Sequence, residues 1–174
     1  MTRRGWNRSR FAGLALLAGL SLMPAAATAA ESCNAGRTEL YCAEATSAPA
    51  VDCHVTQATF ACEYAAPALA VGSSDSALPG QLSVTVETEV GVCAGAGLCK
   101  LTGYEGASGQ CTWGLDGHEC GLEVPFAESE SGLLDGCLYT WVYQRVTARA
   151  GLPGSPAGSV TSGANAESTF HNCE

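Results

Sequence analysis

Residues 111–120, with the sequence CTWGLDGHEC, bring together more chemically able side chains than any other part of the chain. Two cysteines enclose a tryptophan, an aspartate, a histidine and a glutamate. A histidine next to a carboxylate is a common acid–base pair, and sulfur, imidazole and carboxylate groups all bind metals. His118 and Glu119 are therefore candidate catalytic residues, and a small secreted hydrolase that uses His118 is one interpretation.

A hairpin explains the same segment without any chemistry. The Asp-Gly dipeptide at 116–117 is favoured in two-residue turns because both central residues need positive φ. In that register His118 shares a face with apolar side chains and Glu119 lies on the opposite, solvated face. We therefore expect His118 to be a core histidine. The register also sets Cys111 and Cys120 diagonally across the ladder, so we expect each to bridge to another strand unless the loop is longer.

Carboxylates in residues 121–136, with the sequence GLEVPFAESESGLLDG, are a second chemical resource. A glycosidase needs two carboxyl groups roughly 5 to 10 Å apart in a cleft, and Ca²⁺ takes about six to eight oxygen ligands. Glu128 and Glu130 are candidates for either role, and Asp135 is a further candidate calcium ligand. Because the chain has no EF-hand loop, a solvated acidic loop is the favoured interpretation. We expect no cofactor, with calcium as the one alternative.

Other catalytic and metal signatures are missing from the sequence. No G-x-S-x-G pattern of a serine hydrolase occurs. His54 and His171 lie close to cysteines, but neither belongs to a nucleophile or metal motif. The closest cysteines, Cys93 and Cys99, are too far apart in sequence for a zinc pair. The balance favours a protein that is not an enzyme.

The first thirty residues have the order of a secretory signal peptide. Four arginines precede an apolar run over 11–23, and a small-residue tract ending in ATAA follows. We expect cleavage after Ala29 or Ala30, which removes residues 1–30. Since the apolar run is shorter than the roughly 18 residues that cross a bilayer, we expect no membrane insertion after cleavage. These features predict an exported bacterial protein, either secreted or periplasmic.

Removing this leader makes the chain strongly acidic. The leader holds four of the eight basic residues and none of the 17 acidic ones, which leaves four against 17 and a formal charge of −13. Such a surface repels phosphate backbones and anionic lipids, so nucleic acid and membrane surfaces are poor partners. We expect a protein or carbohydrate partner of unknown identity, and the oligomeric state stays open.

All ten cysteines follow the leader, which is typical of a disulfide framework formed in an oxidising compartment. We expect five bridges that stabilise a core poor in bulky side chains, at about 2 to 4 kcal/mol each. Their connectivity cannot be read from the sequence. The cysteines are Cys33, Cys42, Cys53, Cys62, Cys93, Cys99, Cys111, Cys120, Cys137 and Cys173.

Composition divides the remaining chain into segments. A cysteine-rich N-terminal lobe is expected over 31–66, and a disulfide-stapled β domain over 81–174. Between them, residues 67–80 are rich in Pro, Gly and Ser, which predicts a linker or long loop. A second low-complexity stretch over 151–166 predicts a mobile loop.

Hydrophobic periodicity predicts strands. Residues 81–92 alternate between apolar and polar side chains, which indicates a strand with one buried face. Residues 137–149 carry apolar or aromatic side chains on both faces, which predicts a central strand covered on both sides. No later segment has a convincing helical period. The fold class is therefore predicted as all-β, a disulfide-rich antiparallel β-sandwich or barrel.

Abundant structural devices and missing catalytic signatures favour a non-enzymatic function. We expect an exported, disulfide-stabilised, acidic β-rich module that acts in binding or structure, with a role in adhesion, inhibition or the envelope. One alternative is a small secreted hydrolase with a carboxylate pair or His118 in an unrecognised cleft. The other is an adhesion module stabilised by calcium.

Overall fold

The computed structural model describes residues 27–33, 41–75, 77–95, 99–155 and 159–173. Strands make up 77% of these residues, which include no helix, and every strand pair is antiparallel. The prediction of an all-β fold with antiparallel sheets and disulfides is confirmed. Within the part of the chain described, no helix is long and apolar enough to span a membrane.

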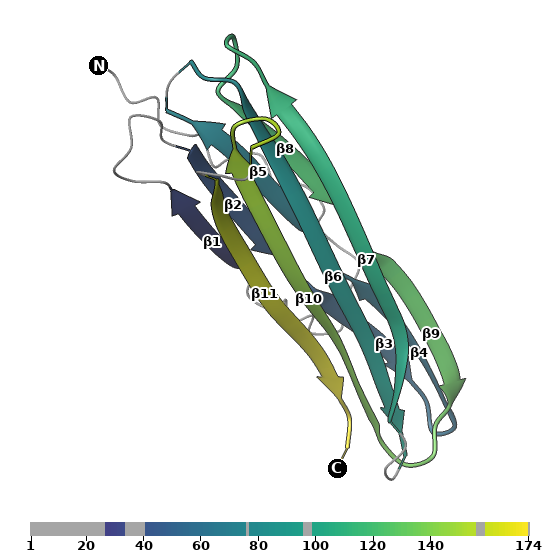
Figure 1. The fold of residues 1–174 in the computed structure, drawn as a ribbon. Helices are drawn as coiled ribbons and strands as arrows, with labels where there is room; N and C mark the ends of the chain where they lie inside the picture. The colour runs from purple at the N-terminus through teal and green to yellow at the C-terminus, as the bar shows by residue number, and fades with distance from the viewer. Residues whose placement is uncertain (1–26, 34–40, 76, 96–98, 156–158, 174) are drawn as a thin grey trace, which may run out of the picture.

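The described residues form eleven strands in three sheets (Figure 1). Sheet A has the order β1-β2-β5-β8, sheet B the order β3-β4-β9, and sheet C the order β11-β10-β6-β7. The strands are β1 (Thr28–Cys33), β2 (Tyr41–Ser47), β3 (Ala50–Val55), β4 (Thr59–Ala65), β5 (Ala68–Ser74), β6 (Gly80–Ala94), β7 (Cys99–Trp113), β8 (Glu119–Val124), β9 (Ala127–Leu133), β10 (Leu138–Gly151) and β11 (Val160–His171).

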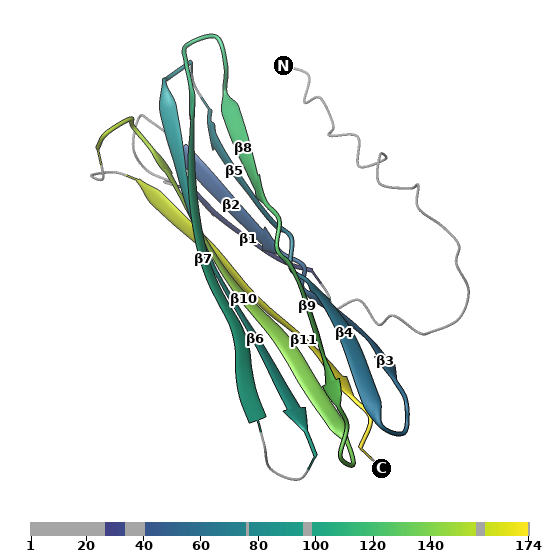
Figure 2. The ribbon, with the colours of Figure 1, turned by 90° about the vertical axis from the view of Figure 1, so that its right-hand side faces the viewer.

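The long strands of sheet C form one layer, and sheets A and B lie end to end in the other (Figure 2). The chain passes from one of these short sheets to the other three times, from β2 to β3, from β4 to β5 and from β8 to β9. A proline lies at each passage: Pro49, Pro67 and Pro125. Because proline has no N–H to donate to a ladder, these three residues interrupt the pairing and divide the layer in two.

Buried polar side chains face this interruption, and we call Ser47, Thr88 and Gln144 the polar belt. Gln144 on β10 is fully buried, and its Nε2 donates to the backbone oxygen of Ala66 at 2.5 Å and to Thr88 Oγ1 at 3.2 Å. Its Oε1 accepts a hydrogen bond from Ser47 Oγ at 2.7 Å. Gln144 thus satisfies a backbone carbonyl beside the break, where an unpaired buried group would be costly.

Two hydrophobic cores lie on either side of the polar belt. The core between sheets A and C consists mostly of alanine and valine around the indole of Trp113. The core between sheets B and C contains larger side chains, including Phe60, Tyr64 and Phe126. Strands from both halves of the sequence contribute to each core.

Two segments expected to be loops contain strands. β5 lies within residues 67–80, and β11 begins inside residues 151–166. In both strands, small side chains alternate between core and solvent, and Ala68, Ala70 and Ala164 are buried. Such a composition favours loops in general, but here small side chains fill the inner faces of closely packed layers.

All ten cysteines form disulfides, so the prediction of five bridges is confirmed. Three bridges join neighbouring strands of one sheet: Cys33–Cys42, Cys53–Cys62 and Cys93–Cys99. Cys111–Cys120 joins sheet C to sheet A, and Cys137–Cys173 joins the segments next to β10 and β11. A framework of this kind indicates an oxidising, extracellular or periplasmic environment.

Candidate functional site

Residues 111–120 cross from one layer to the other and do not form a hairpin. β7 ends at Trp113 and pairs with β6, whereas β8 begins at Glu119 and pairs with β5. Cys111 and Cys120 bond to each other, with their Cα atoms 6.2 Å apart. The prediction that each bridges to another strand is wrong, because the connecting loop is longer than a two-residue turn. The bridge ties the two layers together at this edge.

A catalytic role for His118 and Glu119 stays a prediction. Both side chains are exposed, so the prediction of a core histidine is wrong. The backbone oxygen of His118 accepts a hydrogen bond from the Ser74 N–H at 2.8 Å. Trp113 is the buried residue of this segment, and its Nε1 donates to Ser74 Oγ at 3.0 Å. These two hydrogen bonds connect the segment to Ser74 at the end of β5.

Glu128 and Glu130 lie in strand β9, so the prediction of a solvated acidic loop is wrong for these two residues. Their cross-strand partners are Tyr64 and Cys62, both buried, so the two glutamates point to the inner side of sheet B. β9 is the edge strand of its sheet and faces β7, the edge strand of sheet C. There, Glu130 Oε1 lies 3.8 Å from Lys100 Nζ. The two carboxylates thus line the rim between the layers.

Tyr64 lies behind these carboxylates in the second core. Its hydroxyl hydrogen-bonds Thr140 Oγ1 at 2.6 Å, and Thr140 Oγ1 donates in turn to the Gly91 carbonyl at 2.7 Å. Burial is the main cause that raises the pKa of Tyr64 above its ordinary value of 10.0, and the charges of Glu130 and Glu128 add to it. The phenol is therefore a protonated structural donor at neutral pH.

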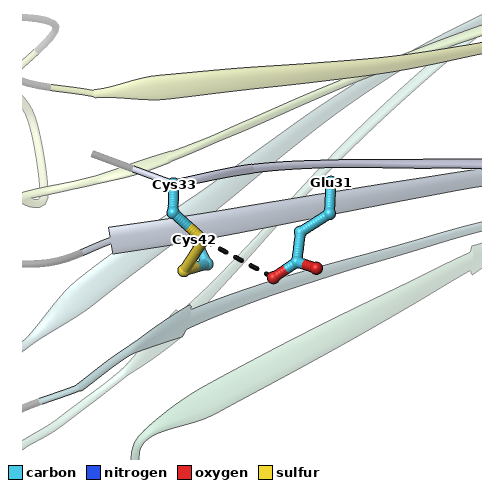
Figure 3. Close-up of side chains that lie close together, drawn as sticks. All are labelled: Glu31, Cys33 and Cys42. Carbon is cyan, nitrogen blue, oxygen red and sulfur yellow. Dashed lines mark hydrogen bonds between the residues drawn. A yellow bond between two sulfur atoms is a disulfide. The ribbon is translucent and has the colours of Figure 1, made fainter. Parts of the chain in front are cut away.

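Candidate calcium ligands do not gather into one cluster. Asp135 is exposed in the turn before β10 and does not form a group of three ligands with Glu128 and Glu130. Within the described residues, one set of three potential ligands has all its ligand atoms within 4.8 Å, and it consists of Glu31, Cys33 and Cys42 (Figure 3). Calcium at Glu128, Glu130 and Asp135 stays a prediction.

The group of Glu31, Cys33 and Cys42 has no thiolate to offer a metal. The two sulfurs bond to each other, and Cys33 Sγ lies 3.4 Å from Glu31 Oε1 (Figure 3). Because a disulfide sulfur carries no proton, this is a close contact and not a donated hydrogen bond. Thiolates are the form in which cysteine binds metals. The group is part of the disulfide framework.

An aromatic row on the outer face of β10 is a stronger candidate for a site. It consists of Tyr139, Trp141 and Tyr143, which share one face because side chains alternate along a strand. Together with Glu89 and Glu167 these residues line a shallow groove with a volume of about 300 Å³. Tyr139 is 36% exposed, and its ring centroid lies 5.6 Å from that of Trp141. The face that was expected to be covered thus faces solvent.

Trp141 is seated on a glycine of the neighbouring strand. Gly91 on β6 lies directly opposite Trp141 in the register. A Cβ atom at Gly91 would lie only 2.0 Å from the indole ring, so the ring occupies the space that any other residue would need. This contact holds the indole low against the sheet, as in other cross-strand pairs of aromatic residues and glycine.

Carboxylates lie on both sides of the aromatic row. Tyr143 pairs with Glu89 on β6 and with Glu167 on β11, so one tyrosine stands between two acidic side chains. Two residue pairs further along, Arg145 Nη1 lies 3.2 Å from Glu87 Oε2. A hydrogen bond with Tyr143 is the first cause that raises the pKa of Arg145, and the charge of Glu87 adds to it. Arg145 is therefore a cation at the end of the groove.

A second hollow of about 510 Å³ lies on sheet B, around Asp52, Glu63 and Ser129. It differs from the groove in having no exposed aromatic ring, since Tyr64, which lines it, is 1% exposed. Asp52, Glu63 and Ser129 lie in one cross-strand row of exposed side chains, and the half-buried Glu128 of the neighbouring row also lines the hollow. The groove over β10 thus offers the more varied chemistry.

No protein-family model matches the chain, and no curated protein shows significant similarity to it. The class of the protein is therefore defined by its fold and its surface. It is an all-β, disulfide-stabilised protein with a solvent-facing aromatic row bordered by carboxylates.

Proposed function

We propose that this protein is an exported binding module that holds polysaccharide chains against the outer face of sheet C. The aromatic row carries the proposal. Alternate residues of a strand are about 7 Å apart, so Tyr139, Trp141 and Tyr143 present successive rings along one line. Among the expected roles, this surface favours adhesion to a polysaccharide.

The chemistry of the groove suits sugar rings. Aromatic faces stack on the apolar C–H faces of sugars, and carboxylates accept strong hydrogen bonds from hydroxyl groups. Glu89 and Glu167 stand beside Tyr143, where the hydroxyl groups of a stacked sugar would lie. Small-molecule sites bury most of their ligand in a deep cavity, whereas this groove is shallow and suits an extended chain.

Binding to a panel of polysaccharides tests this proposal. The panel contains cellulose, chitin, xylan and peptidoglycan as insoluble material, and the bound fraction is measured after sedimentation. We expect the wild type to bind at least one of them and Trp141→Ala to lose most of that binding. Thr147→Ala is the matched control, because Thr147 lies exposed on β10 outside the groove. Binding that survives Trp141→Ala unchanged would refute the proposal.

Hydrolysis is a different outcome of the same experiment. Glu128 and Glu130 are two residues apart on one face of β9, so their carboxylates lie side by side. Glycosidase carboxyls flank the scissile bond, and this arrangement favours binding over hydrolysis. Release of reducing sugar from the panel that Glu128→Gln abolishes would establish the hydrolase instead.

The position of signal-peptide cleavage decides whether β1, the first strand of sheet A, stays intact. Thr28 Oγ1 donates to the Asn165 carbonyl at 3.0 Å, and Ser162 Oγ donates to the Ala30 carbonyl at 2.6 Å. These bonds tie β1 to β11. Cleavage after Ala29 or Ala30 would remove one or both of the β1 residues that make them.

A cleavage position two residues earlier would leave β1 whole. Residues 25–27 are three alanines, which also fit the small-x-small pattern of signal peptidase sites. Cleavage after Ala27 therefore gives a mature chain that begins at Thr28. Intact-mass measurement of the exported protein tests this, and a chain that begins at Ala30 or Glu31 would contradict it.

A further inference from the structure

Neither carboxylate of the groove forms a close ion pair in the described part of the chain, although Glu89 lies within the electrostatic reach of Arg145. In the described part of the chain, the ion pairs are Lys100–Glu130 and Arg145–Glu87. Neither pair includes Glu89 or Glu167. Both side chains are exposed and stand on opposite sides of Tyr143.

The other groups around the groove leave its charge negative. Across the sheet, the next neighbour of Glu89 is Tyr104 on β7. Arg145 supplies one positive charge, which hydrogen-bonds with Tyr143 and pairs with Glu87, so it does not balance Glu87, Glu89 and Glu167 together. His171 lies at the far end, with its ring 6.0 Å from that of Tyr139. A ligand in the groove therefore meets aromatic side chains and two carboxylates that form no close ion pair.

We infer that the groove selects polysaccharides that carry free amino groups, such as polymers of glucosamine. This inference rests on the proposed function and names its ligand class. Stacking on Trp141 and Tyr139 serves neutral and amino sugars alike. A protonated amine above Tyr143 gains a cation–π interaction with the ring and ion pairs with Glu89 and Glu167.

Charge complementarity favours this ligand over an acidic polysaccharide. The chain without its leader has a formal charge of −13, and two of its carboxylates border the groove. An acidic sugar would be repelled both at a distance and at contact. An amino sugar is attracted at both ranges, and its attraction weakens with salt.

Calorimetry with two oligosaccharides of equal length tests the inference. The probes are the hexamer of glucosamine and the hexamer of N-acetylglucosamine, at a pH that keeps the amines protonated. We expect the wild type to bind the glucosamine hexamer more tightly, by up to about 25-fold if each of the two exposed ion pairs adds up to about a factor of five. High salt should reduce this preference.

A pair of double variants separates contact from general charge. Glu89→Gln with Glu167→Gln should abolish the preference for glucosamine and keep the weaker binding of the acetylated hexamer. Glu44→Gln with Glu123→Gln is the matched control, because these exposed residues of sheet A carry the same charge away from the groove. We expect it to keep the preference.

The outcomes distinguish the inference from the proposed function. If both hexamers bind equally and the groove double variant changes nothing, amine selection is wrong and sugar binding stands. If the two double variants lose the preference equally, the effect comes from net charge and the groove assignment is wrong. If neither hexamer binds and the polysaccharide panel is also negative, the proposed function fails as well.

Discussion

The same four long strands of sheet C cover two different cores. The core between sheets A and C consists mostly of alanine and valine, and its aromatic residues are Trp113 and Tyr41. Over sheet B the long strands meet Phe60, Tyr64 and Phe126. Large side chains bury more apolar surface per position than alanine does. The half over sheet A thus has less hydrophobic burial per residue and a greater need for other constraints.

The edges of the two halves differ in the same sense. Over sheet A, Cys111–Cys120 joins β7 to β8 across the layers. Over sheet B, the same edge has the 3.8 Å ion pair of Lys100 and Glu130, whose side chains are 71% and 29% exposed. An exposed ion pair adds little stability. The half whose core has the larger side chains therefore has no disulfide across this edge, and it also has the aromatic row on its outer face.

Replacing Gln144 gives the largest expected effect on stability. It tests whether the polar belt holds the two halves in one cooperative unit. Gln144→Ala leaves the Ala66 carbonyl without its donor and opens a cavity between the cores. We expect a loss of about 3 to 5 kcal/mol in the free energy of unfolding, measured with urea. Thr147→Ala should change it by less than about 0.5 kcal/mol. A loss below about 1 kcal/mol for Gln144→Ala would show that the belt is dispensable.

Two disulfides of equal loop length separate the effect of an inter-layer bridge from that of a bridge within a sheet. Cys111–Cys120 and Cys33–Cys42 both have a sequence separation of 9, so constraint of the unfolded chain predicts an equal loss of about 2.5 kcal/mol. We expect replacement by two alanines to cost more at 111 and 120, because only that bridge joins the layers of the alanine-rich half. Equal losses in urea unfolding would mean that both bridges act through the unfolded chain alone.

Two glycines of sheet C test how the aromatic row is held. Gly91→Ala displaces the Trp141 indole from its position over residue 91. We expect a loss of about 1 to 3 kcal/mol in the free energy of unfolding and a loss of most polysaccharide binding. Gly106→Ala on β7 is the control, since a Cβ atom there has nothing within 4 Å. We expect it to keep both stability and binding. Tryptophan fluorescence that changes equally in the two variants would contradict a specific contact between the Trp141 indole and Gly91.

Much of the fold could be predicted from alternation and cysteine content. The apolar positions of residues 81–92 are buried as expected, and so are Leu138, Val142 and Val146. The small-residue strands could not be recognised, because Ala68 and its neighbours look like a loop until an opposing layer is known. The role of the prolines was equally hidden, since a proline marks a break in pairing without saying which strands align.

The candidate site was only partly visible in the sequence. The alternation of Tyr139, Trp141 and Tyr143 was recognised, but the other face of that strand is apolar too, so the solvent side could not be chosen. The residues that border the row, Glu89 and Glu167, come from strands far apart in sequence. Their convergence depends on strand order, which a single sequence does not give.

Tyr64→Phe tests the link between the core of sheets B and C and the groove on the outer face of sheet C. The variant removes the hydrogen bond to Thr140, which itself donates to the Gly91 carbonyl under Trp141. We expect a loss of about 1 to 1.5 kcal/mol at neutral pH, measured with urea. A smaller change than about 0.3 kcal/mol would show that the bond adds nothing net.

The pH dependence of the same variant follows from the raised pKa of Tyr64. In the unfolded chain the phenol ionises near 10.0, whereas burial keeps it protonated in the fold to a higher pH. Its contribution is therefore complete below pH 10.0 and is lost as pH rises through the folded pKa. Above pH 10.0, we expect the wild type to lose stability more steeply than Tyr64→Phe. Parallel curves would contradict a buried, protonated phenol.

Calcium should have the smallest effect. It tests whether the edge between β7 and β9, which has no disulfide, is a metal site. Glu128 and Glu130 line that edge, but with Asp135 they do not bring three ligand atoms together, and Ca²⁺ needs about six oxygens. We therefore expect the Tm in millimolar calcium to differ from that in EDTA by less than about 2 °C, which is below roughly 1 kcal/mol. A rise of several degrees that is absent in a variant with both Glu128→Gln and Glu130→Gln would instead establish a calcium-stabilised module. It would also show that this edge closes around an ion, so that each half has its own crosslink.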